Sequence, residues 1–189
     1  TGLEDYWTYT SETAGALAGC HVNHFTGMLS AVIQDLETGN QRNGVAISHI
    51  YNDTAAINTD LMFSGVKIGS GWRLNIQETL AKRYLDSFSY DSAQPNSGTY
   101  YLHTDEDGTF HYFNWDQSKN CYTLQDDPTT VLEVLANQRV NIRYRDKTIK
   151  EFNNDYLSAI VDPYGNRVEI SYLIFGNAMR YAPSEVREI

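Results

Sequence analysis

Apolar and polar residues alternate along most of this chain, which is the pattern of β-strands with one face buried and one face in water. Only residues 75–88 carry enough Leu, Ala, Glu and Lys to suggest a helix, yet Trp72, Leu74 and Ile76 alternate there and favour a strand. We therefore predict an all-β fold in which helix is scarce. The predicted strands lie near residues 28–35, 43–51, 71–80, 99–104, 109–115, 120–125, 138–145, 147–153, 156–161 and 167–175.

The stretch IVDPYGNRVEISY at residues 160–172 predicts a tight hairpin. Asp162 suits the first position of a type I turn because its carboxylate accepts backbone N–H groups, and Pro163 fixes φ at the second position. Gly165 then takes the left-handed conformation that a three-residue loop with a bulge requires. This register places Ile160 opposite Val168 in the paired strands.

The segment TDEDGT repeats the same turn chemistry earlier in the chain, with Asp105 and Gly108 at the equivalent positions. The same register places His103 opposite His111. From about residue 99 onward, breaks of this kind recur at short and fairly regular spacing. The pattern predicts an antiparallel meander of hairpins.

No linker divides the chain, so we interpret residues 1–189 as a single continuous β region. The weakest stretch is 86–98, DSFSYDSAQPNSG, which is rich in Ser, Asp, Asn, Pro and Gly. Such a composition predicts a loop, here between a first sheet and the meander.

The charge balance makes nucleic acid a poor candidate partner. The chain has 14 Lys and Arg against 24 Asp and Glu, a formal net charge of −10, whereas phosphate binding relies on a basic footprint. The one basic segment, residues 139–150, is interpreted as a solvated strand face, since Val140 and Ile142 alternate inward while Asn141 and Arg143 point outward.

No segment has the apolar length of a membrane span or the plan of a signal peptide, so we expect no membrane insertion. Because the sequence starts at Thr1 rather than at a Met, we expect it to be a region of a larger protein.

Two groups of residues carry side chains that can bind a metal ion. Cys20, His21 and His24 lie close together in CHVNH, but no second pair follows at a spacing that completes a zinc site. His103 and His111 could hold a metal or act as a pH switch, although two histidines on an exposed hairpin are more often ordinary surface residues. We predict no metal site and no cofactor.

The two cysteines, Cys20 and Cys121, form no metal or redox motif. A disulfide between them is one alternative. The favoured alternative is that both are small buried apolar side chains.

No catalytic motif is present. Gly69 and Gly71 lack the third glycine and the following helix of a dinucleotide fingerprint, and predict instead a tight bend that lets Trp72 pack. Most acidic residues occupy turn positions, where carboxylates cap backbone N–H groups. We therefore expect the chain not to be an enzyme.

The segment YRDKTIKEFNNDYLSAIVDPYGNRVEISY resembles a unit of the RHS/YD-repeat family, whose repeats end in a pattern of the form L..I.DP.GN...Y.Y. The matching positions are Leu157, Ile160, Asp162, Pro163, Gly165, Asn166 and Tyr172. Upstream, VNHFTGMLS, ISHIYND, GSGWRLNIQETL and DEDGTFHYF resemble the run that opens such proteins. The resemblance implies that residues 1–90 are the opening segment and that residues 99–175 are a YD-type meander.

The resemblance implies a curled antiparallel sheet, as at the start of a shell that encloses or presents another segment, often a toxin. It implies a non-catalytic structural module of a secreted or cell-surface protein. The implied partners are adjacent repeats of the parent chain and an enclosed toxin segment. The long repeat array and the self-cleaving core of full members have no counterpart here.

A repeat unit cannot bury its apolar face alone, so we expect exposed sheet edges and self-association. In particular, NRVEISYLIF ends in an apolar run with no predicted partner strand, which favours strand addition there. The alternative function is a carbohydrate- or cell-surface-binding module. A row of exposed coplanar aromatic side chains would favour glycan binding, whereas aromatic side chains packed inward would favour a scaffold.

Overall fold

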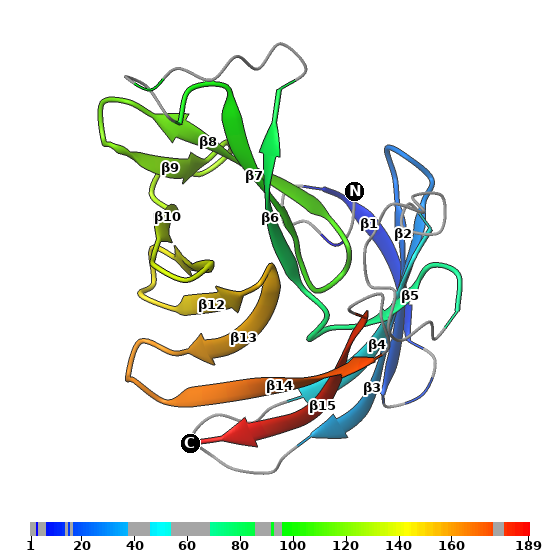
Figure 1. Cartoon of the computed structure of the whole chain (residues 1–189). Helices are drawn as coiled ribbons and strands as arrows, with labels where there is room; N and C mark the ends of the chain where they lie inside the picture. The colour runs from blue at the N-terminus through cyan, green and yellow to red at the C-terminus, as the bar shows by residue number, and fades with distance from the viewer. Residues whose placement is uncertain are drawn as a thin grey trace.

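The computed structural model describes residues 3, 7–13, 15, 17–37, 46–53, 69–85, 92, 96–175 and 180–189. In these residues every secondary-structure element with assigned bounds is a β-strand, as the sequence predicts. Every pairing between these strands is antiparallel (Figure 1). No helix in this part is long and apolar enough to cross a membrane. Residues 43–45 of one predicted strand, and most of the loop predicted at 86–98, lie outside the described residues.

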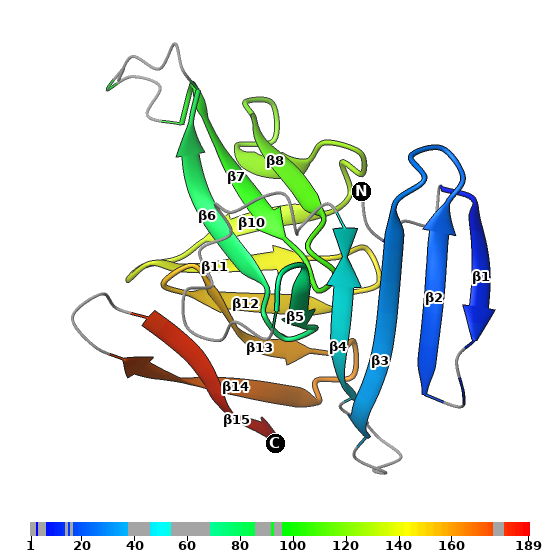
Figure 2. The same cartoon turned by 90° about the vertical axis from the view of Figure 1, so that its right-hand side faces the viewer.

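The first five strands form one sheet in the order β1-β2-β3-β4-β5. Figure 2 shows this sheet beside the rest of the molecule, with β4 and β5 nearest to it and β1 farthest away. The strands are β1 (Tyr9–Thr13), β2 (Ala18–Asn23), β3 (Leu29–Glu37), β4 (Ala46–Asn52) and β5 (Trp72–Leu74).

The other ten strands form a second sheet that curls until it meets itself. One edge of β13 pairs with β12, and at Tyr156 its other edge pairs with Thr79 of β6, which closes an eight-stranded barrel from β6 to β13. β14 and β15 continue from β13 as a hairpin. The strands are β6 (Thr79–Tyr84), β7 (Thr99–Thr104), β8 (Phe110–Asp116), β9 (Cys121–Leu124), β10 (Val131–Val134), β11 (Arg139–Arg143), β12 (Ile149–Asn153), β13 (Tyr156–Val161), β14 (Arg167–Phe175) and β15 (Arg180–Glu188).

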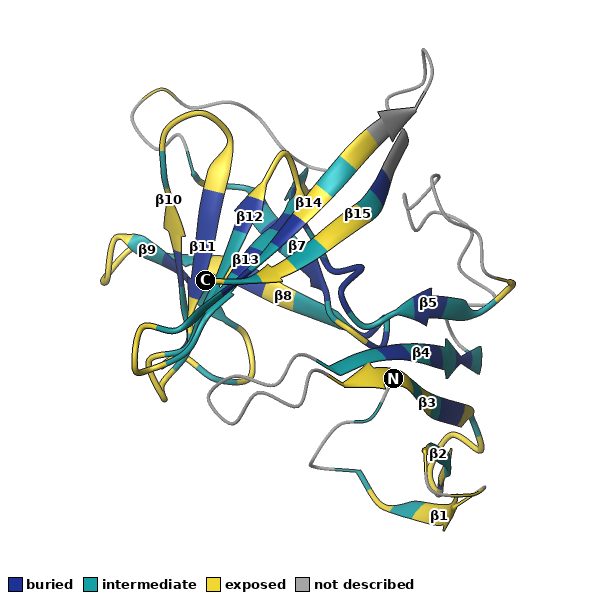
Figure 3. Ribbon diagram, turned by 90° about the horizontal axis from the view of Figure 1, so that it is seen from below, coloured by how far each residue is buried: buried dark blue, intermediate teal, exposed yellow. Residues whose placement is uncertain are grey.

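The main core fills the barrel, because alternate residues of each strand point inward when the sheet curls. Figure 3 shows buried segments around the ring and on β4 and β5, while β1 is largely exposed. The buried apolar cluster comprises Ile76, Leu80, Tyr101, Phe113, Tyr122, Leu132, Val140, Ile142, Phe152, Leu157 and Ile170.

The 162–166 hairpin has the predicted register, with Ile160 opposite Val168. Asp162 Oδ1 accepts the backbone N–H groups of Tyr164 and Asn166, both at 2.8 Å. Asn166 also donates from its amide to Asp162 Oδ2 at 2.6 Å. Pro163 stands second in this turn and lacks the N–H that the others contribute.

The turn glycines adopt the left-handed backbone that the turn requires, with φ of +88° at Gly165 and +90° at Gly108. A Cβ added at Gly165 would meet no atom of the described residues within 4 Å, so we expect a substitution there to act through backbone strain. We expect Gly165→Val to lower the free energy of unfolding by roughly 1–2 kcal/mol, because β-branched residues rarely adopt positive φ. Chemical denaturation measures the loss. Gly165→Asn is the matched control, since Asn tolerates this conformation, and equal stability of the two variants would contradict the strain argument.

Three expectations about strands were wrong. β14 is not unpaired, because all nine of its residues except Arg167 pair with β15. The predicted strand at 71–80 is two strands in different sheets, interrupted at residues 75–78, where the N–H of Gln77 closes a turn on the carbonyl of Leu74. β1, β2, β10 and β15 were not predicted.

Candidate functional site

A buried ion network lies where the barrel closes. Glu78, directly before β6, accepts a hydrogen bond from His103 Nε2 at 2.8 Å. Lys150 Nζ donates to both oxygens of the same carboxylate, at 2.8 and 3.0 Å, and lies 3.1 Å from Glu106. The backbone carbonyl of Glu78 also accepts the N–H of Leu157. The network therefore ties β6, β7, β12 and β13 together.

The electrostatics of the network favour its charged form. The side chains of Glu78 and Lys150 are only 2% and 16% exposed. Burial alone would raise the pKa of Glu78, but the Lys150 ammonium and the hydrogen bond from His103 lower it to about 2. Burial likewise disfavours the Lys150 cation, yet Glu78, Tyr144 and Glu106 raise its pKa above the ordinary value. The pair is thus a buried ion pair at neutral pH.

A second imidazole–carboxylate pair extends the network. His111 Nε2 lies 2.9 Å from Asp105 Oδ2, and its ring packs 5.7 Å from that of His103. Asp105 also accepts the N–H of Thr109 at 2.9 Å, as its turn position predicts. Burial opposes ionisation of Asp105, but the hydrogen bonds with His111 and Asp107 and the nearby His103 together outweigh it, so the pKa is lowered.

The cross-strand pairing of His103 with His111 is as predicted, but their placement is not. His103 is buried, 3% exposed as a residue, rather than an ordinary surface residue. The hairpin that carries it is curled into the barrel, so the face expected to meet water meets Phe152 and Glu78 instead.

Arg73 of β5 connects the first sheet to this network. Its guanidinium donates to the backbone carbonyl of Gln77, while its Nε is buried and has no hydrogen-bond partner among the described residues. Burial lowers the pKa of Arg73 against the opposing effect of nearby carboxylates, first among them Asp105 and Glu78. Asn52 of β4 adds a second link by donating to the carbonyl of Asp107 at 2.9 Å.

Two cavities flank the network. The first, about 340 Å³, has an apolar floor that includes Ile160 and Ile170. The second, about 590 Å³, is lined by both histidines, Asp105 and Tyr144 among others. Glu106 and Lys150 line both cavities, so the two cavities adjoin at these side chains.

The hydrogen bonds of Glu78 and His103 suit a structural role, in which the ion network holds the strands of the barrel together. Oε1 of Glu78 is bonded to Lys150 and Oε2 to both Lys150 and His103, so this carboxylate could accept a proton only by breaking a buried ion pair. The imidazole of His103 is bonded to a carboxylate, and within the described part of the chain it has no bond to a hydroxyl or thiol that it could activate.

Sequence reasoning missed Glu78, Arg73 and Lys150. The sequence predicts that Lys150 lies on a solvated basic face. In a strand, however, Lys150 lies on the same face as Phe152, two residues later, and Phe152 is buried. This alternation was the feature of the sequence that could have identified Lys150 as buried. The other expectations for that segment hold in part. Val140 and Ile142 are buried and Arg143 is exposed, but Asn141 is 9% exposed rather than solvated.

The candidate metal ligands Cys20, His21 and His24 do not converge on a common site. Adjacent residues Cys20 and His21 of β2 point to opposite faces. His21 Nδ1 is bonded to the hydroxyl of Ser11 at 2.9 Å, and His24 Nε2 to that of Thr10 at 2.6 Å. Across the described part of the chain, no group of three or more His, Cys, Asp or Glu could hold a metal ion. The thiols of Cys20 and Cys121 are free.

The opposite end of the barrel is aromatic. Tyr122 packs edge-to-face against both Tyr101 and Trp115, with ring centroids 4.9 and 5.1 Å apart. The hydroxyl of Tyr122 lies 2.6 Å from that of Thr99 and donates to Asn96 Oδ1 at 3.2 Å. A cavity of about 550 Å³ opens here.

Comparisons of the chain with protein-family models, with curated proteins and with solved structures found no match.

Proposed function

We propose that the chain is a non-catalytic structural module of a secreted or cell-surface protein of the RHS/YD-repeat type. In this proposal the closed barrel is a rigid element, and the five-stranded sheet packs its outer apolar face against further segments of the parent chain. The assembled shell encloses or presents another segment, for example a toxin.

The observation that carries the proposal is an apolar face on β2 and β3. Val22 pairs directly with Leu29, and Ala18 with Ile33, so all four side chains share one face of the sheet. Val22, Leu29 and Ile33 are 40%, 38% and 37% exposed. Neighbouring apolar side chains exposed together on a sheet are typical of a surface that another element covers.

Two further features agree with a scaffold. Tyr101, Phe113 and Tyr122 are at most 6% exposed and pack inside the barrel, so they do not form a row of platforms for sugar rings. The Glu78–Lys150 ion pair links strands of the barrel to one another.

The outer strand β15 is less suited to strand addition than the sheet face is. It contains Pro183, which has no N–H to donate, and the charged residues Glu185, Arg187 and Glu188. Proline and charges on an edge strand are common devices against pairing with another chain. We therefore place the contact with adjacent repeats on the face of the first sheet.

The proposal predicts that the isolated chain self-associates through this face. We expect the double substitution Val22→Thr and Ile33→Thr to shift the association equilibrium toward monomer by tenfold or more, about 1.4 kcal/mol, in sedimentation experiments. Thr keeps the β-branched shape, so the melting temperature should change little.

Tyr112→Thr is the matched control, because Tyr112 is 42% exposed but lies on β8 of the barrel. A chain extended by the adjoining segments of its parent should be monomeric with or without the double substitution. If Tyr112→Thr disrupts association as strongly as the double variant, or the isolated chain is monomeric at high concentration, the proposed contact is wrong.

A further inference from the structure

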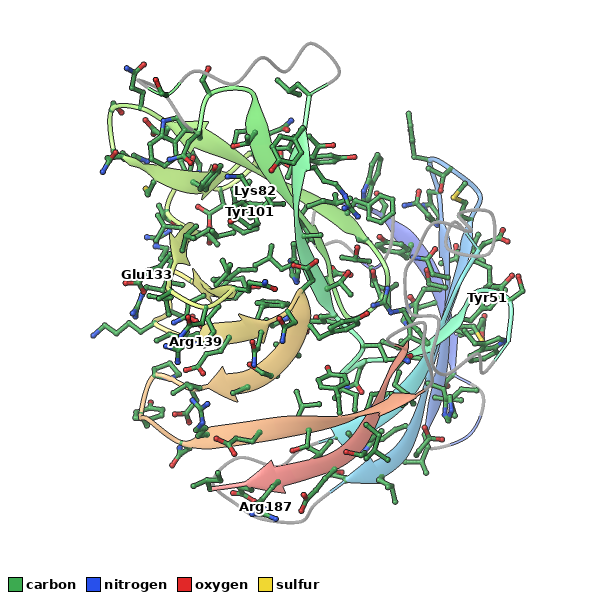
Figure 4. The ribbon with its side chains drawn as sticks, in the orientation of Figure 1. Tyr51, Lys82, Tyr101, Glu133, Arg139 and Arg187 are labelled. Carbon is green, nitrogen blue, oxygen red and sulfur yellow. The ribbon has the colours of Figure 1, made fainter. Side chains whose placement is uncertain are left out.

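The aromatic end of the barrel carries a cation, Lys82, that has no counter-charge among the described residues. Lys82 of β6 pairs with Tyr101 of β7, and both line the 550 Å³ cavity. Figure 4 shows these two residues together within the ring of strands, with Glu133 toward the β10 side. Within the described ranges, no carboxylate or other hydrogen-bond acceptor contacts the Lys82 ammonium.

The other charges of this cavity neutralise each other. Glu133 and Arg143 also line it and form an ion pair at 2.8 Å. Lys150, by contrast, belongs to the opposite end of the barrel and is paired with Glu78 and Glu106. Among the described residues that line this cavity, Lys82 is therefore the one positive charge without a paired carboxylate, in a protein whose formal net charge is −10.

The remaining walls combine apolar surface with amides. Trp115 is half-buried, and Val134 is 53% exposed although Leu132, two residues earlier on the same side of β10, is buried. Asn96 and Asn120 also line the cavity. An aromatic ring suits the apolar face of a sugar, and amides suit its hydroxyl groups. The volume falls within the range of small-ligand sites.

We propose that this cavity binds an acidic sugar unit, with its carboxylate on Lys82, its ring against Trp115 and its hydroxyls toward Asn96 and Asn120. The positive charge distinguishes this ligand from a neutral sugar, and the amides distinguish it from a purely aromatic acid. The site lies inside the barrel mouth and is separate from the apolar face of the first sheet, so the two proposals can fail independently.

The test is to titrate the full chain with D-galacturonic acid and, separately, with D-galactose. Binding is measured from changes in the NMR signals of the Trp115 indole and of neighbouring amides. We expect galacturonic acid to bind at least about tenfold more tightly than galactose, because an ammonium–carboxylate hydrogen bond is charge-assisted. Lys82→Met should abolish this preference. Lys147→Met, which removes the same charge from an exposed turn, should preserve it.

Added salt provides a measurement that needs no variant. It should weaken binding of the acid and leave that of galactose unchanged. The proposal is overturned if neither sugar shifts these signals, if galactose binds as tightly as the acid, or if Lys82→Met retains the preference. Equal binding of benzoate would overturn the assignment to a sugar.

Discussion

Replacing Lys150 by Met is expected to lower the free energy of unfolding by about 3–5 kcal/mol, since it leaves the buried Glu78 carboxylate without its main counter-charge. The side chain also loses its contact over the Tyr144 ring, 5.8 Å from the ammonium to the ring centroid. Met retains most of the apolar stem, so the loss measures the charge more than the packing. Urea denaturation followed by fluorescence gives the difference directly.

A double-mutant cycle with Glu78→Gln identifies the ion pair as the cause. The loss from Lys150→Met should be much smaller in the Glu78→Gln background, because the two side chains contact each other directly. Lys147→Met is the surface control and should change stability by no more than about 0.5 kcal/mol. Equal losses from Lys150→Met in both backgrounds would show that the network does not couple these residues.

The local features of this fold follow from short stretches of sequence. The 105–109 and 162–166 turns each depend on an aspartate, a glycine at positive φ and the strands on either side, all within a few residues. Once the turn is known, the register follows, and this is why His103–His111 and Ile160–Val168 are paired as predicted. The all-β class follows from the same alternation.

The ion network depends on long-range closure and was not predictable in this way. Glu78 and Lys150 are 72 residues apart and meet only because β13 returns to β6. The sequence around Lys150 is basic and predicts exposure, and nothing in it indicates that Glu78 is the partner of this lysine. β15 was missed for a different reason. Its proline and charged residues protect an edge strand from pairing with another chain, but the same residues interrupt the apolar–polar alternation from which strands are predicted.

The same closure gives the protein a specific acid sensitivity. The pKa of Glu78 is about 2 in the folded chain, against an ordinary value of 4.5, because the attraction of Lys150 and the hydrogen bond from His103 outweigh its burial. A carboxyl group with a lowered pKa stabilises the fold at pH values above its unfolded pKa. This contribution is lost as the pH falls from about 4.5 toward about 2.

We therefore expect the wild-type chain to lose about 3 kcal/mol more than Glu78→Gln between these two pH values, as the difference between the folded and unfolded pKa implies. Asp105 and Asp162 also have lowered pKa values, but they are present in both proteins and their contributions cancel in the comparison. The measurement is the urea midpoint of both proteins at a series of pH values. Glu78→Gln should begin less stable at pH 7 and converge on the wild type at low pH. If the urea midpoints of the two proteins change in parallel with pH, the barrel does not hold Glu78 in its ionised form. The stabilisation at this end of the barrel would then come from packing alone.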